Sequence, residues 1–271
     1  MERNHCHSKP LKTDFVRAAN HPRASNAAGF TLLELLVVLG VIAMLIAVQV
    51  PVLAGGKSQS KIAICASHVR QLALSCQIYA NENGDRLPIL IGSAAWAWDM
   101  PASAANALLH YGAQTNTFYC PGTAPKFTDA QNWAGPGSTL WGFSTTFHIV
   151  GYSFAFSGPA SMLSPTNQNT TIQPEAISNF PSPGMTTTYR ASERVLVADA
   201  ILSTGPVQPG YAHPENNYAD IAGGFYLHHV SPHLKGVVPM GGNLGFKDGH
   251  VDWRDFKFMT PRNPGGPYFW W

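Results

Sequence analysis

The chain has 271 residues, of which 45% are hydrophobic and 12% charged, and its formal net charge is +2. The basic excess lies in residues 1–29, which hold five Lys and Arg against two Asp and Glu, a net charge of +3. The remaining residues carry a net charge near −1. This distribution offers no basic patch for nucleic acid, so we expect no nucleic-acid partner.

Residues 30–50 form an almost unbroken apolar run of 21 residues. A helix of this length spans roughly 30 Å, which is the thickness of the hydrocarbon core of a bilayer. We therefore expect one transmembrane helix over residues 30–51. Because basic flanks stay on the cytoplasmic side, residues 1–29 should form a cytoplasmic leader. The rest of the chain would then be exported from the inner membrane to the periplasm or the cell surface.

A secretory signal peptide is the main alternative, since it also places a basic region before an apolar core. The small residues of its cleavage site follow that core. Here Ala27, Ala28 and Gly29 precede the apolar run instead. Cleavage at Gly29 would remove only the leader and leave the apolar helix at the new N-terminus.

The stretch "GFTLLELLVVLGVIAMLIAVQVP" resembles the class III signal of type IV pilins and type II secretion pseudopilins. The resemblance implies that a prepilin peptidase cuts after Gly29 and methylates Phe30. It also implies that Glu34 is the family's acid near the start of the mature chain, and that Pro51 is its helix-loosening proline.

Glu34 is the one acid of this apolar run. A carboxylate in hydrocarbon costs several kcal/mol unless it finds a partner. We hypothesise that Glu34 of one subunit pairs with the new Phe30 amine of a neighbour and thereby sets the axial register of a filament. Alternatively, Glu34 lies near enough to the membrane surface to stay hydrated.

Residues 52–84 are predicted to continue the helix, with Pro51 bending or loosening it. Apolar residues recur there at spacings of three and four, which indicates a helix with one buried face. The predicted end is set by Gly84, a natural C-cap, and by Pro88. The stripe consists of Ile62, Cys65, Val69, Leu72, Cys76 and Tyr79.

Residues 85–271 are rich in Gly, Pro, Ser, Thr and Asn, and helical periodicity disappears. We expect a β-rich head packed on the helix, which makes the fold class α+β. Asp248-Gly249 predicts a tight hairpin that places Leu244 and Phe246 on one face with Val251 and Trp253. Residues 164–188 are polar and proline-rich, which predicts a long surface loop. The predicted strands lie in segments 117–120, 145–156, 194–199 and 243–256.

The later segments "FYCPG", "SERVLVADA" and "NLGFKDGHVDWR" resemble pseudopilin-like proteins of planctomycete and verrucomicrobial bacteria. The C-terminal signature of those proteins is a His followed by Asp-Gly. The match is imperfect, because the fourteen residues between His233 and Asp248 make a longer spacer than that signature has.

His233, Asp248 and His250 are weak candidates for metal ligands, since His and carboxylate suit zinc. No close-spaced ligand pair frames them, so ordinary turn and surface roles are expected, with no metal and no cofactor. The sequence also lacks a nucleophile elbow, a P-loop and a dinucleotide-binding motif. We therefore expect no enzyme.

Cys65 and Cys76 share the helix stripe but are about 16 Å apart along its axis, too far to bond each other. In an oxidising compartment, Cys120 could form a disulfide with either Cys65 or Cys76.

The predicted function is that of a structural subunit, a pseudopilin or minor pilin, of a type II secretion or type IV pilus-like filament. Its expected partners are the prepilin peptidase/methyltransferase, other pilin or pseudopilin subunits, the inner membrane and the assembly platform. The alternative is a single-pass anchored binding module for carbohydrate or another envelope ligand. That alternative uses aromatic surface from Trp96, Trp98, Trp133, Trp141 and the terminal "YFWW".

Overall fold

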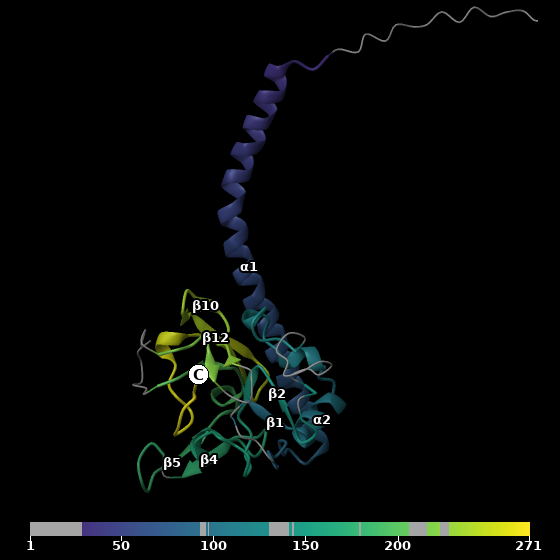
Figure 1. The fold of residues 1–271 in the computed structure, drawn as a ribbon. Coiled ribbons are helices and arrows are strands. Elements are labelled where there is room, and N and C mark those ends of the chain that lie inside the picture. The colour runs from purple at the N-terminus through teal and green to yellow at the C-terminus, as the bar shows by residue number, and fades with distance from the viewer. Residues whose placement is uncertain are drawn as a thin grey trace, which may run out of the picture. The chain divides into compact units, whose positions relative to one another are not determined.

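The computed structural model describes residues 29–92, 96, 98–129, 141–142, 144–178, 180–205, 216–222 and 228–271, without the side chains of residues 48–55. These residues form a long N-terminal helix followed by antiparallel strands (Figure 1), which confirms the predicted α+β fold class. The chain divides into two compact units, Met1–Val50 and Pro51–Trp271, and each is described by itself.

Short strands and single-turn helices make up most of the second unit. The helices are α1 (Leu32–Glu82), α2 (Ala102–His110) and the 3-10 turns η1 (Thr115–Phe118), η2 (Pro121–Thr123), η3 (Pro165–Asn167), η4 (Ala191–Glu193) and η5 (Phe256–Phe258). The strands are β1 (Asp99–Pro101), β2 (Phe147–Ile149), β3 (Tyr152–Phe154), β4 (Glu175–Ser178), β5 (Thr186–Tyr189), β6 (Val195–Asp199), β7 (Ile201–Ser203), β8 (Ile221–Ala222), β9 (His228–His229), β10 (Leu234–Lys235), β11 (Val238–Pro239), β12 (Gly241–Phe246), β13 (Val251–Asp255) and β14 (Tyr268–Trp270).

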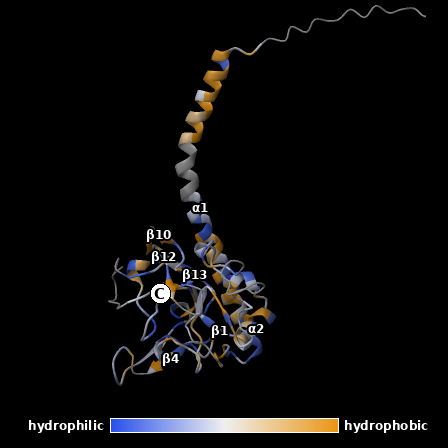
Figure 2. Ribbon diagram, viewed as in Figure 1, coloured by the Kyte–Doolittle hydropathy of each residue, from blue (hydrophilic) through white to orange (hydrophobic). Residues whose placement is uncertain are grey.

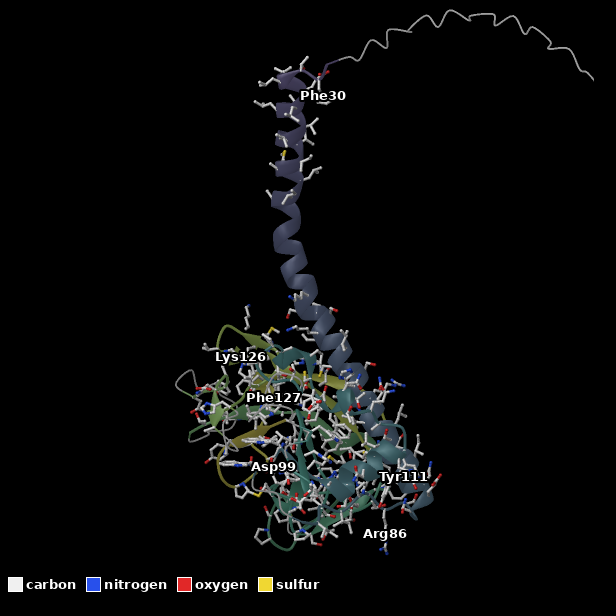
Figure 3. All side chains as sticks on the ribbon, turned by 45° about the vertical axis from the view of Figure 1, so that its right-hand side comes forward. Phe30, Arg86, Asp99, Tyr111, Lys126 and Phe127 are labelled. Atoms are coloured by element: carbon white, nitrogen blue, oxygen red, sulfur yellow. The ribbon has the colours of Figure 1, made fainter. Side chains whose placement is uncertain are left out.

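In the first unit, α1 displays apolar side chains over its whole circumference. All residues from 29 to 47 are exposed, and Phe30, Leu32 and Met44 are each more than 70% exposed. Figure 2 shows the hydrophobic colour along this stretch, and Figure 3 shows its side chains standing out on all sides of the ribbon. Among the described residues, no helix combines the length and the apolar character that crossing a bilayer requires. The span predicted over residues 30–51 extends into side chains outside the described set.

In the second unit, the amphipathic part of α1 buries the predicted stripe. Cys65, Val69, Leu72 and Cys76 are fully buried. The helix ends at Glu82, and Gly84 follows in the left-handed region with φ +63, as its predicted capping role requires. The stripe prediction is therefore confirmed at these positions.

The central sheet has the strand order β13-β12-β6-β3, with every pairing antiparallel. Strand β12 lies along α1. The Asn243 amide donates to the Ile62 carbonyl at 3.3 Å, and the Gln77 amide donates to the Lys247 carbonyl at 2.9 Å. Between these points Gly245 faces the helix, where an added Cβ would lie 2.8 Å from Cγ1 of Val69. Glycine at this position lets helix and strand approach closely.

The β12–β13 hairpin forms as predicted, but its register differs by one residue. Gly245 pairs with Val251, and the Phe246 amide donates to the His250 carbonyl. The loop is therefore Lys247-Asp248-Gly249 rather than Asp248-Gly249 alone. Because side chains alternate along a strand, this shift moves Val251 and Trp253 to the face opposite Leu244 and Phe246. The prediction that these four side chains share one face of the hairpin is therefore wrong.

Two other local predictions were also wrong. Residues 117–120 were predicted as a strand, but Thr115–Phe118 forms the 3-10 turn η1. Residues 164–188 were predicted as a long loop, but they contain η3 and, with Tyr189, the β4–β5 hairpin.

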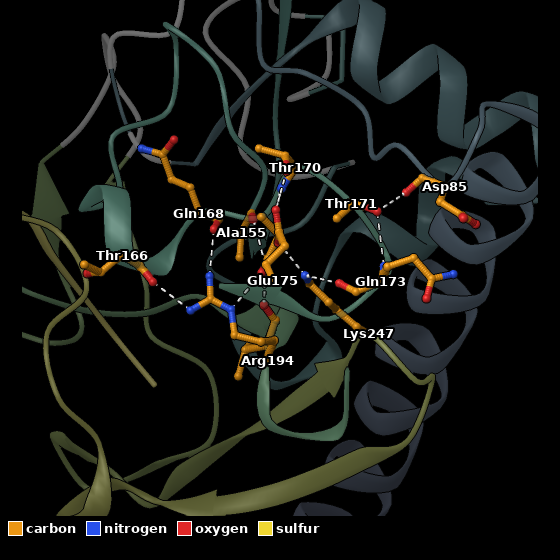
Figure 4. A network of polar contacts seen from close by, with 12 residues as sticks. Asp85, Ala155, Thr166, Gln168, Thr170, Thr171, Gln173, Glu175, Arg194 and Lys247 are labelled. Carbon is orange, nitrogen blue, oxygen red and sulfur yellow. Dashed lines mark hydrogen bonds and ion pairs between the residues drawn. The ribbon is translucent and has the colours of Figure 1, made fainter. Parts of the chain in front are cut away.

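Two buried cations hold the segment after η3 to the sheet (Figure 4). Arg194 donates to the Asn169 side chain at 2.9 Å and to the Gln168 carbonyl at 2.7 Å. Lys247, with its side chain fully buried, forms an ion pair with Glu175 at the start of β4. These charge-assisted hydrogen bonds fix a polar segment that has no apolar periodicity of its own.

The aromatic residues named for sugar binding pack in the core wherever the structure describes them. Trp98 is 1% exposed, and Trp96 stacks on it with ring centroids 5.4 Å apart. Residues 269–271 are buried, and Trp141 packs against the core. Trp133 lies outside the described residues. The described aromatics thus provide core packing rather than a sugar-binding surface.

We predict that Gly245→Ala lowers the free energy of unfolding by about 1–3 kcal/mol, because the added methyl overlaps Val69 in a packed contact. Urea unfolding of the full chain, followed by tryptophan fluorescence, measures this change. The matched control is Gly265→Ala, where an added Cβ meets nothing within 4 Å. The control should stay within about 0.5 kcal/mol of wild type. Equal effects of the two substitutions would contradict the close helix–strand contact.

Candidate functional site

The predicted processing and assembly residues lie at the start of α1. Gly29 and Phe30 precede the helix, and both are exposed. Thr31 is the N-cap residue: its backbone N–H and its hydroxyl each donate to Glu34 Oε2 at 2.8 Å, and its hydroxyl accepts from the Glu34 N–H at 3.2 Å. This reciprocal pattern is a capping box, which satisfies donors left free at a helix start. Pro51 lies within α1, but its side chain is outside the described set.

The capping box gives Glu34 a local role that the sequence analysis missed. The signal for it was present, because Thr31 and Glu34 stand three residues apart at the start of an apolar run. An acid in the first turn also interacts favourably with the positive end of the helix dipole. Glu34 therefore stabilises the helix start within its own chain.

The structure does not contain the possible disulfide of Cys120 with Cys65 or Cys76. Cys65, Cys76 and Cys120 are all free and buried. Cys120 does lie near Cys65 rather than Cys76, but both sulfur atoms face polar partners. Cys65 Sγ donates to Asp199 Oδ1 at 2.9 Å, and Cys120 Sγ lies 3.4 Å from His233 Nε2.

These four residues form a compact buried group, here called the Cys–Asp–His cluster: Cys65, Cys120, Asp199 and His233. One potential ligand atom from each side chain lies within 4.8 Å of all the others. His233 Nε2 is also 3.4 Å from Asp199 Oδ2. Sulfur, imidazole nitrogen and carboxylate oxygen are donor atoms that bind zinc in proteins.

Each cluster residue is held by a different element. Cys65 projects from the buried stripe of α1, and Asp199 ends β6. Cys120 is the N-cap of η2 and accepts the Gly122 N–H at 3.3 Å. His233 adopts φ +55, an uncommon conformation for a non-glycine residue. An added Cβ on Gly122 would lie 2.8 Å from the His233 ring, so glycine is needed beside it.

Burial and contacts within the cluster shift the pKa values of Cys120 and His233. Burial raises the pKa of the Cys120 thiol well above its usual value. Burial is the largest single effect on His233 and lowers its pKa. The hydrogen bonds and charges of Asp199 and Cys65 together outweigh burial and raise the pKa to about 9. Without a bound cation, the cluster therefore favours a protonated His233 imidazole.

His233 is the only one of the three weak metal candidates that joins this cluster. Asp248 and His250 contact each other at the hairpin, where both side chains are more than a third exposed. His250 also stacks on Phe246 with ring centroids 4.1 Å apart. Sequence reasoning missed the two cysteines and Asp199 as ligands, although "CPG" at residues 120–122 places a cysteine before a tight turn.

The pKa of His229 is shifted in the opposite direction from that of His233. Its ring lies 3.9 Å from that of Phe127 and 5.2 Å from that of Trp98, measured between centroids. Burial lowers its pKa to about 3. The imidazole is therefore neutral in the folded protein at neutral pH.

Residues 24–48 match the prokaryotic N-terminal methylation motif. The chain thus carries a prepilin-type signal of the kind found in type IV pilins and pseudopilins, and its α+β architecture is consistent with a pilin-like fold. No curated protein and no solved structure matches the chain.

We predict that His229 makes the protein sensitive to acid. Its folded pKa of about 3 lies below the unfolded value of 6.5, so its contribution is complete above pH 6.5 and is lost as the pH falls toward 3. Wild type should lose about 1.4 kcal/mol per pH unit more than His229→Phe in this window. Chemical unfolding at a series of pH values measures both slopes.

The matched control for lost packing is Phe127→Leu, which perturbs the same contact and keeps the imidazole. It should lower stability and retain the wild-type slope. Parallel profiles for wild type and His229→Phe would contradict the neutral buried imidazole.

Proposed function

We propose that the chain is a structural subunit, a pseudopilin or minor pilin, of a type II secretion or type IV pilus-like filament. The observation that carries this proposal is the prepilin-type signal at residues 24–48. Prepilin peptidase would cut after Gly29 and methylate Phe30, and the subunits would assemble through the helix that follows. The proposed role is structural rather than enzymatic.

The exposed apolar surface at the start of α1 supports this role. Thirteen large apolar side chains between Phe30 and Ile46 are each at least 45% exposed. Contiguous apolar surface of this kind marks a membrane or protein contact. In the proposed cycle, the inner membrane covers residues 30–51 before assembly, and neighbouring subunits cover them in the filament.

The carboxylate of Glu34 can serve two partners in this arrangement. Both bonds from Thr31 fall on Oε2. A carboxylate can accept about four hydrogen bonds, so an amine can join them. In our proposal that amine is the methylated N-terminus at Phe30 of a neighbouring subunit, which would fix the axial position of one subunit against the next.

The proposal implies a defined topology and a set of partners. The basic leader stays in the cytoplasm, and the unit Pro51–Trp271 is exported to the periplasm or the cell surface. The partners are the prepilin peptidase/methyltransferase, other pilin or pseudopilin subunits and the secretion or pilus assembly platform.

We predict that Glu34→Gln abolishes filament assembly but leaves leader cleavage and membrane association intact. Glutamine keeps the capping box and removes the negative charge that the neighbour's amine requires. Assembly is measured by shearing filaments from cells and by cross-linking, and cleavage by N-terminal sequencing. The mature chain should begin at methylated Phe30.

Thr31→Val is the matched control, since it removes the hydroxyl of the capping box and keeps the carboxylate. It should cost the helix start about 1 kcal/mol and allow assembly. Normal assembly of Glu34→Gln would exclude the pairing role. A failure confined to Thr31→Val would instead show that Glu34 acts only as a cap.

A further inference from the structure

We propose that the Cys–Asp–His cluster is a structural zinc site, with Cys65, Cys120, Asp199 and His233 as its ligands. All four residues lie in the unit Pro51–Trp271, so the metal content can be measured whether or not the chain assembles into a filament. It would join α1 to the sheet and to the segments around η2 and β10.

The spacing of the ligand atoms fits a tetrahedral ion. Zinc bonds of about 2.3 Å to sulfur and 2.0–2.2 Å to nitrogen or oxygen place neighbouring ligand atoms roughly 3.3–3.8 Å apart. His233 Nε2 lies 3.4 Å from Cys120 Sγ and 3.4 Å from Asp199 Oδ2. These two separations match tetrahedral zinc coordination, and all four ligand atoms lie within 4.8 Å of one another.

The orientation of the imidazole distinguishes a ligand cluster from a catalytic triad. In a triad, the histidine uses one nitrogen for the nucleophile and the other for the carboxylate. Here the same nitrogen, Nε2 of His233, faces both Cys120 and Asp199. A single nitrogen that points at a sulfur and a carboxylate is directed at the centre of a shared coordination sphere.

Burial and charge also favour a divalent cation. All four side chains are buried, and buried polar groups are costly unless they are paired or coordinate a metal. On binding zinc, the two thiols and the His233 imidazolium would release their protons to solvent. Two thiolates and one carboxylate would then carry three negative charges, of which zinc would neutralise two. Lys57 and Lys61 line the adjacent pocket with His233, and the Lys61 ammonium donates to the Ala124 carbonyl at 3.1 Å.

The surroundings of the cluster provide supporting contacts and access. The Gly122 N–H donates to Cys120 Sγ, and the Asn243 backbone N–H donates to Asp199 Oδ2 at 2.7 Å. Such outer contacts orient ligands and are typical of metal sites. A pocket of about 250 Å³, lined in part by Gly122, His233 and Leu234, borders the cluster on the side of the imidazole.

The test uses the full chain in detergent, purified with an affinity tag that lacks histidine and without chelators. Elemental analysis should find about one zinc per chain. Cys120→Ser should reduce this content at least about tenfold, since it removes one ligand of four. Cys76→Ser is the matched control, because Cys76 is equally buried on the same helix face but lies outside the cluster, and it should retain the metal.

A second measurement on wild type does not depend on the folding of a variant. After metal removal, cobalt(II) should bind and give the intense thiolate charge-transfer and d–d absorption of a tetrahedral site, and zinc should displace it. A wild-type chain that holds no zinc as purified and takes up no cobalt overturns the proposal. So does equal metal loss in Cys76→Ser, or a Cys65–Cys120 disulfide in the mature protein found by mass spectrometry under non-reducing conditions.

Discussion

The close contact between α1 and β12 is the constraint on which the rest of the second unit depends. Gly245 lets the helix backbone come near the strand. On either side of Gly245, side chains form hydrogen bonds between α1 and the β12 segment. This contact orients the buried stripe of the helix over the sheet. It thereby brings Cys65 to Asp199 at the end of β6, the strand that pairs with β12. A helix held further away could not complete the cluster.

Sequence patterns predicted the elements whose apolar residues follow a clear local pattern. The stripe around Val69 follows helical spacing, and β6 is a run of apolar residues, so each is determined by its local sequence. The hairpin was also evident, but its register depends on whether two or three residues form the loop. A difference of one residue exchanges the faces, and local sequence distinguishes these alternatives poorly.

The segments that escaped prediction are held by distant partners. Residues 164–178 have no apolar pattern, and their order comes from Arg194 and Lys247, which approach from other parts of the chain. The Cys–Asp–His cluster likewise depends on contacts between residues far apart in the sequence, since its members are spread from residue 65 to residue 233. No spacing rule joins residues so far apart, although each sits at a recognisable position on a helix face, a turn or a strand end.

The capping box at Thr31 and Glu34 bears on what maturation does to the chain. All three of its hydrogen bonds lie on the C-terminal side of Gly29, so loss of the leader breaks none of them. The helix would have the same shape before and after cleavage, but the electrostatics of its tip would change. A cationic amine would appear beside the positive end of the helix dipole, which disfavours it, and beside a Glu34 carboxylate that already accepts two hydrogen bonds from Thr31. Maturation would in this way act as an electrostatic trigger, creating a positive charge at a helix start whose own acid is already engaged as a cap.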